Sequence, residues 1–107
     1  MTTFDKREEG FEKQFAHDAD LKFKANARRN RLLGLWAAAK LGLPEAEAAA
    51  YAKEVVIADL EEAGDDDVFR KIRKDFDAKG VKESDHQIRR TMDELMAKAI
   101  AEIKASG

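Results

Sequence analysis

The chain has 107 residues, which is enough for one domain with a modest hydrophobic core and too few for two. Its 20 basic and 22 acidic residues give a net charge of −2, so the protein as a whole has no positive electrostatic potential that would bind a nucleic-acid backbone. No cysteine is present, so disulfides and thiol chemistry are excluded. The N-terminal stretch is too charged for a signal peptide, and no apolar run approaches the roughly 20 residues that span a bilayer. We therefore expect a cytoplasmic protein that is neither exported nor inserted in a membrane.

Composition and glycine spacing predict an all-α fold. Ala, Glu, Lys, Asp and Arg dominate, while the single Pro and few β-branched residues leave little material for a sheet. Glycines at 42, 64 and 80 stand where helices can end in the left-handed conformation. The breaks predict helices at about 20–41, 44–62, 66–79 and 85–104. We expect these to pack as a four-helix bundle over residues 20–107, with residues 1–19 as a separate, flexible or fraying segment.

One side of the first predicted helix is apolar enough to face the core. At 100° per residue it collects the apolar residues Leu21, Ala25, Leu32, Leu35, Trp36 and Ala39, with Arg28 as the only polar residue in the series. This pattern predicts a buried side that is anchored by Trp36.

The last two helices have clear start signals and apolar stripes. The third begins with three aspartates, which suit the positive end of a helix dipole. Ser84 and Gln87 have the spacing of a capping box before the fourth helix. The expected buried residues are Val68, Phe69, Ile72 and Phe76 in the third helix and Ile88, Met92, Leu95, Met96, Ala99, Ile100 and Ile103 in the fourth.

Three phenylalanines form a second stripe near the N-terminus. Phe4, Phe11 and Phe15 fall within a narrow arc of an ideal helix, rotated roughly 90° from the predicted core side of the first helix. Gly10 lies inside this stretch and disfavours a stable isolated helix. Two interpretations stay open: the stripe packs back onto the bundle, or it inserts into a groove on a partner and folds there.

Basic residues cluster at two places, Arg28–Arg31 and Arg70–Lys74. They are either solvated helix faces with salt bridges or a docking surface for an acidic partner, formed by Arg28, Arg29, Arg31, Arg70 and Arg73. No aromatic residues interleave with the bases, so nucleic-acid binding is not expected.

No pattern typical of catalysis or of a bound cofactor is present. The chain lacks a phosphate-binding Gly-rich loop, a zinc-protease motif and a nucleophile elbow. His17 and His86 are isolated in the sequence, and Asp65–Asp67 lack the rest of a calcium loop. We therefore expect no enzyme activity, no metal and no cofactor.

Three long segments resemble the zeta inhibitor subunit of alphaproteobacterial F-type ATP synthases. They are FDKREEGFEKQFAHDADLKFKANARRNRLLGLWAA, AYAKEVVIADLEEAGDDDVFRKIRKDFDAKG and SDHQIRRTMDEL, in the same order over nearly the whole chain. The resemblance implies a four-helix bundle whose N-terminal segment enters an interface between subunits of the catalytic head, near the rotor, and blocks ATP hydrolysis.

On this sequence the resemblance places the inhibitory region at about Thr2 to Ala19. The expected partner-binding residues are Phe4, Phe11 and Phe15 as buried anchors and Arg7, Lys13 and His17 as polar contacts. The expected partners are the catalytic head subunits and the rotor of a membrane-bound ATP synthase, and the free protein is expected to be monomeric. The alternative is a stand-alone helical binding module that holds an acidic protein or a nucleotide through its basic helix faces.

Overall fold

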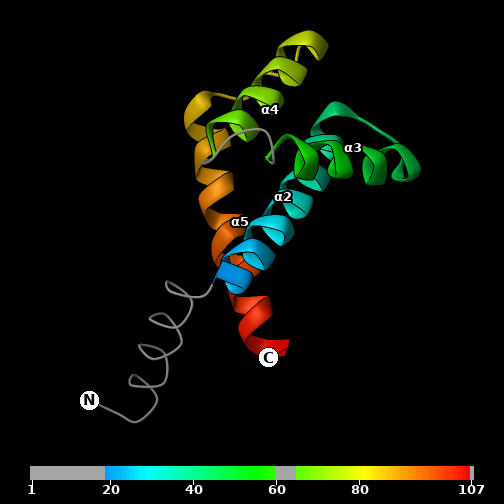
Figure 1. The fold of residues 1–107 in the computed structure, drawn as a ribbon. Helices are drawn as coiled ribbons and strands as arrows, with labels where there is room; N and C mark the ends of the chain where they lie inside the picture. Colours follow the sequence, from blue (N-terminus) through cyan, green and yellow to red (C-terminus); the bar gives the residue numbers. More distant parts are fainter. Residues whose placement is uncertain (1–18, 60–64, 107) are drawn as a thin grey trace.

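A computed structural model describes residues 19–59 and 65–106, and these two ranges contain four helices. They are α2 (Ala19–Leu41), α3 (Glu45–Ala58), α4 (Asp66–Lys79) and α5 (Asp85–Ser106) (Figure 1). No strand occurs in these two ranges, so the predicted all-α, four-helix fold is confirmed. Helix α2 is central, because it packs along α3 and α5 and also touches α4.

Most helix ends follow the sequence signals. Gly42 and Gly80 adopt positive φ values of 75° and 71° directly after α2 and α4, as expected for glycines that end helices. The Ser84 hydroxyl accepts a hydrogen bond from the backbone N–H of Gln87 at 3.1 Å, as the capping box predicts. Helix α3 starts one residue later than predicted, after Pro44.

Helix α3 also ends earlier than its sequence suggests. It stops at Ala58, with Asp59 as the capping residue, whereas a helix to about Glu62 was predicted. The chain from Asp59 to Glu62 is acidic, and negative charge is unfavourable at the negative end of a helix dipole. Residues 60–64, including the predicted end at Glu62, lie outside the described part of the chain.

The core lies where α4 and α5 meet α2 and α3. Val68, Ile72 and Phe76 of α4 are fully buried, and Phe69 is half-buried, which confirms the predicted stripe. In α5 the buried residues are Ile88, Met92 and Ala99, and the other predicted residues of that stripe are half-buried. Trp36 is half-buried and packs its ring against that of Phe76, with the centroids 5.6 Å apart.

The predicted core side of α2 is wrong. The buried residues are Ala25, Arg29, Asn30, Leu33, Gly34, Ala37 and Ala38, and only the first of these was predicted. Leu35 and Ala39 are exposed, and Leu21 and Leu32 are half-buried. The buried side is therefore rotated toward the small residues of the helix.

Close approach of α3 to α2 explains the rotation. A Cβ atom built on Gly34 would lie 2.5 Å from the Cα of Ala52, so the two backbones meet where neither residue has a large side chain. Such contact buries small residues at the crossing point and leaves the bulky ones beside it. Helical periodicity favours the side with the largest apolar side chains, so it does not predict that the small residues are the buried ones.

Candidate partner-binding surface

The six residues expected to touch a partner lie outside the described residues. They are Phe4, Arg7, Phe11, Lys13, Phe15 and His17. The predicted offset between the phenylalanine stripe and the core side also changes, because the buried side of α2 differs from the predicted one. On an ideal helix the stripe is nearly in phase with Ala25 and Arg29, and Asp18 and Lys22 interrupt the series.

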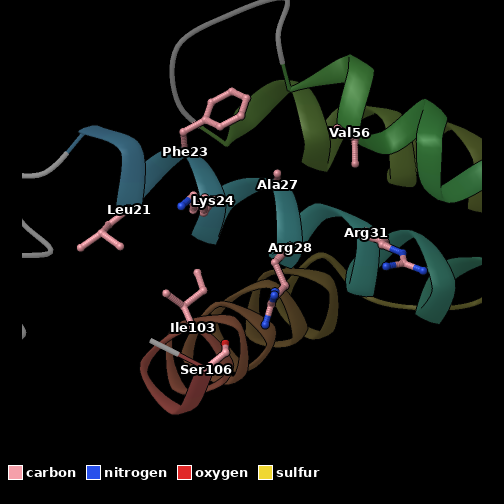
Figure 2. A pocket seen from close by; sticks show the side chains of 9 residues that line it. All are labelled: Leu21, Phe23, Lys24, Ala27, Arg28, Arg31, Val56, Ile103 and Ser106. Atoms are coloured by element: carbon pink, nitrogen blue, oxygen red, sulfur yellow. The ribbon is translucent and has the colours of Figure 1, made fainter.

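A hollow lies on the outer side of α2, between the end of α5 and the end of α3. Its volume is about 710 Å³, and its walls include Phe23 and Ala27 of α2, Ile103 of α5 and Val56 of α3. Figure 2 shows that these side chains come from three helices, with Phe23 and Ala27 on the first turns of α2. The hollow begins at Leu21, two residues after the first described residue.

A second hollow continues the first along the contact of α2 with α3. It has a volume of about 630 Å³ and is lined by Leu35, Ala49 and Ile57, and it shares Arg31 and Val56 with the first hollow. We call the two together the outer groove. It runs from Leu21 to Leu35 on α2, and it includes Leu21, Arg28 and Leu35 from the side that periodicity assigned to the core.

Large apolar side chains of the outer groove are open to solvent. Phe23 is 64% exposed, Ile57 60% and Leu35 38%. Scattered exposed apolar residues are normal on a protein surface, whereas adjacent ones in a groove are typical of binding sites. The sequence signal that could have identified the groove is Val55-Val56-Ile57, since three consecutive apolar residues on a helix cannot all face one core.

Basic side chains border this apolar surface. Lys24, Arg28, Arg31 and Lys53 all line the two hollows and are exposed. Arg28 forms an ion pair with Glu102 at 3.6 Å, and within residues 19–59 and 65–106 the other three have no ion-pair partner. The groove is therefore suited to an apolar segment with acidic neighbours.

Arg29, one of the arginines expected on a docking surface, is buried in this structure. Only 1% of it is exposed, and its guanidinium donates hydrogen bonds of 2.7 Å to Asn30 Oδ1 and to Asp65 Oδ1. A buried charge needs such partners, because an unpaired one costs several kcal/mol. Arg29 thus ties α2 to the start of α4.

Asp59 lies beside this buried pair. Burial raises the pKa of its carboxyl. A hydrogen bond from Asn30 and the positive charge of Arg29 act in the opposite direction and offset part of this increase. The Asp67 side chain is also buried and accepts a hydrogen bond from the backbone N–H of Val68 at 2.9 Å. These polar contacts join the helices, with Arg29 and Asp67 buried and Asp65 partly exposed.

Arg73 is likewise engaged within the protein. It donates to Asp77 Oδ1 at 2.8 Å, to Asp85 Oδ1 at 3.1 Å and to the Glu83 carbonyl at 2.6 Å. Its donors join α4 to the connection before α5. Arg73 is one of the five arginines expected on a docking surface, and in this structure it holds α4 to the connection before α5.

Arg70 is exposed and lies in a mixed patch with Lys71, Lys74, Asp67 and Asp75. The two acids balance much of the positive charge there, so the patch is a weaker match for an acidic partner than the outer groove. Arg28 and Arg31 remain as exposed arginines on that groove.

Tyr51 connects α3 to α4 at the edge of the same patch. Its hydroxyl donates a 2.7 Å hydrogen bond to Asp75 Oδ2, and Lys71 Nζ lies 5.1 Å from the ring centroid. Burial, with the nearby Asp75, raises the pKa of the Tyr51 hydroxyl, so the hydroxyl stays protonated and remains a donor. These contacts are structural.

Neither a metal centre nor a membrane span is found in the described part of the chain. Within residues 19–59 and 65–106, no three His, Cys, Asp or Glu side chains are grouped so that they could hold a metal ion. No helix in those ranges is long and apolar enough to cross a membrane.

A family model for the ATPase inhibitor subunit zeta matches residues 1–102. The chain belongs to this family. A protein whose structure was determined in solution by NMR is 47% identical to this zeta-family chain and has a TM-score of 0.72. The similarity covers 81% of this chain and 99% of that one. No curated protein sequence matches the chain.

Membership of the zeta family confirms the resemblance inferred from the sequence. The family description is that of a subunit that inhibits an ATPase. The family match also includes the N-terminal segment, which therefore belongs to the shared pattern of zeta-family chains.

Proposed function

We propose that this zeta-family protein inhibits ATP hydrolysis by an F-type ATP synthase by inserting residues 1–19 at a catalytic interface of the enzyme head. The bundle stays outside the interface and holds the segment in place. Phe4, Phe11 and Phe15 are the buried anchors, and Arg7, Lys13 and His17 make polar contacts. The protein acts at the synthase from the cytoplasmic side, as a peripheral subunit.

The single observation that supports this proposal is that the four described helices form a core of their own. The core cluster runs from Leu33 to Met92 and draws on all four helices. Among the described residues, Phe76 is the fully buried phenylalanine of that cluster. The family match from residue 1 onward supports a role for the segment in inhibition.

Tethering makes such a short segment effective. Burying three phenylalanine rings contributes on the order of 2 kcal/mol each, while ordering some fifteen residues costs a comparable amount. When the bundle also contacts the head, the segment is held at a high effective concentration, and binding becomes tight without new contacts. An inhibitor that fits one state of a rotating interface also binds that state most tightly, by linkage.

Deletion of residues 1–18 tests the proposal. The truncated chain should lose inhibition of ATP hydrolysis by the cognate synthase head, measured as ATP turnover against inhibitor concentration, while circular dichroism still reports a helical bundle. Full inhibition by the truncated chain would place the effector elsewhere.

Substitution of the rings refines that test. The double variant Phe11→Ala, Phe15→Ala should weaken inhibition by a factor that corresponds to about 2–4 kcal/mol, which is typical of central aromatic anchors. The matched control is Glu9→Ala, because on an ideal helix Glu9 lies on the side opposite the rings. Equal potency of the double variant and the control would contradict the assignment of the anchors.

A further inference from the structure

We propose that residues 1–18 of the free protein dock into the outer groove of their own bundle, and that binding to an ATPase must first release them. The docked state is a second use of the phenylalanine stripe. The competition with the ATPase rests on the proposed function, whereas the docking itself does not.

The position of the groove favours this occupant over any other segment. The groove begins at Leu21, and residues 1–18 enter the described chain at Ala19. A segment tethered two residues from a site meets it at millimolar effective concentration. It needs only a short reversal near residues 16–18 to lie antiparallel to α2, and helix hairpins are commonly joined by two to five residues.

The lengths agree as well. From Phe23 to Leu35 the groove follows α2 for about 18 Å, at 1.5 Å per residue. From Phe4 to Phe15 a helix would extend about 16 Å. A docked helix would therefore place its first ring near Leu35 and its last ring near Phe23.

Charge complementarity is the second argument. On an ideal helix Asp5, Glu8 and Glu12 lie on one flank of the phenylalanine stripe, and the lysines of the segment lie on the far side. The groove presents the opposite sign along its border.

Lys24, Arg31 and Lys53 form that border, and none has an ion-pair partner within residues 19–59 and 65–106. The acidic flank of the segment would meet these cations while its rings cover Phe23 and Ile57, the two most exposed large apolar residues described. Individual surface pairs contribute little, so the attraction is modest and sensitive to salt.

Docking of the segment in the outer groove needs only a modest affinity to regulate inhibition. If the docked form is populated at 80–90%, the segment is available to the ATPase for only the remaining fraction, and its apparent affinity falls by about five- to tenfold. Docking keeps the rings of the segment away from other proteins. The ATPase can still displace the groove if its interface encloses the rings more fully.

The absence of cysteine allows a direct test on the full-length protein. A nitroxide attached at Thr3→Cys should broaden the amide NMR signals of Leu35, Lys53 and Ile57 at the far end of the groove, and leave those of Lys79 and Lys82 sharp. A double variant, Phe23→Gln with Ile57→Gln, changes two largely exposed side chains and should abolish the broadening at Leu35 and Lys53. High salt should reduce it.

Two outcomes would overturn the docking. One is far-end signals that stay as sharp as those of Lys79. The other is broadening that persists when isotope-labelled protein without a nitroxide is mixed with unlabelled protein that carries one, because the occupant is then a second copy of the chain.

Inhibition assays test the competition. Release of the segment in the double groove variant should raise inhibitory potency about five- to tenfold. Unchanged potency of a variant that has lost the NMR contact would overturn the regulatory role. A chain that shows the NMR contact but inhibits no synthase head in any form would refute the proposed function and leave the docking intact, so the two failures are distinguishable.

Discussion

At Gly34 the backbone of α2 comes so near to α3 that a single methyl group decides the spacing of the two helices. An added Cβ would lie 2.5 Å from Ala52 Cα and 3.1 Å from Ala52 Cβ, and backbone atoms cannot move aside as the end of a flexible side chain can. Glycine inside a helix otherwise costs up to about 1 kcal/mol relative to alanine. The contact therefore outweighs helix propensity here.

Replacing Gly34 with Ala should destabilise the protein by about 1–3 kcal/mol, the usual cost of overpacking, after the gain in helix propensity is offset. Urea unfolding measures this loss. Gly80→Ala is the matched control, because a Cβ there meets no atom within 4 Å and the cost comes only from its φ of 71°. A stabilised Gly34→Ala variant would show that the helices separate without penalty.

The charge on Asp59 should make stability depend on pH. Burial raises its pKa in the folded protein above that in the unfolded chain, so the folded state holds the proton more tightly. The resulting stabilisation is present below the ordinary carboxyl pKa and is lost as pH rises through the raised one.

Asp59→Asn cannot ionise and keeps a similar size. As pH rises from about 3 to about 7, the free energy of unfolding of the variant should therefore increase relative to that of the wild type. Chemical denaturation at several pH values gives the comparison, and parallel profiles would show that the folded protein does not perturb this carboxyl.

At the scale of helices, sequence patterns succeeded where one side of an element is bulky and the other charged. Helices α4 and α5 have such sides, and their buried stripes and the Ser84 cap were predicted. The central helix α2 is apolar on more than one side, so periodicity selected the wrong one. Close packing at Gly34 and a buried Arg29 are decided by the partner helices, which a single-helix pattern does not contain.

Arg73 illustrates how one side chain can connect two elements. Hydrogen bonds to Asp77 and Asp85 raise the pKa of its guanidinium, which stays charged, and a third bond reaches the Glu83 carbonyl before α5. Arg90 is similar in pairing with an acid four residues later, Glu94, at 3.0 Å, but it lies exposed on a single helix.

Arg73→Ala should therefore lower the melting temperature more than Arg90→Ala does, because only the first substitution removes contacts that join α4 to the start of α5. Thermal unfolding followed by circular dichroism compares the two variants. Equal losses would mean that the contacts of Arg73 do not stabilise the α4–α5 connection.

For the whole molecule, the all-α class and the family could be predicted from sequence, and the binding surface only in part. The expected anchors Phe4, Phe11 and Phe15 remain a prediction, since they lie outside the described residues. The outer groove was missed because its residues come from three helices, and only the tertiary arrangement brings Phe23, Val56 and Ile103 together.

The bundle and its N-terminal segment should be thermodynamically separable. Deleting residues 1–18 should lower the free energy of unfolding by about 1–1.4 kcal/mol, the amount that a segment docked in 80–90% of the molecules contributes by mass action. The slope of the free energy of unfolding against urea concentration should change little, because the core cluster is retained. A loss of several kcal/mol would mean that the segment is part of the core.

The two ends of the described bundle lie side by side, since Leu21 near the start of α2 and Ser106 at the end of α5 line the same hollow. Both helices extend from that shared edge toward the other end of the molecule, so their chain directions are opposed (Figure 1). A mechanical load applied between the ends would open them turn by turn, as a zipper opens, instead of sliding one helix past the other. The fold should therefore yield to a weak pull along this direction, however closely its interior is packed.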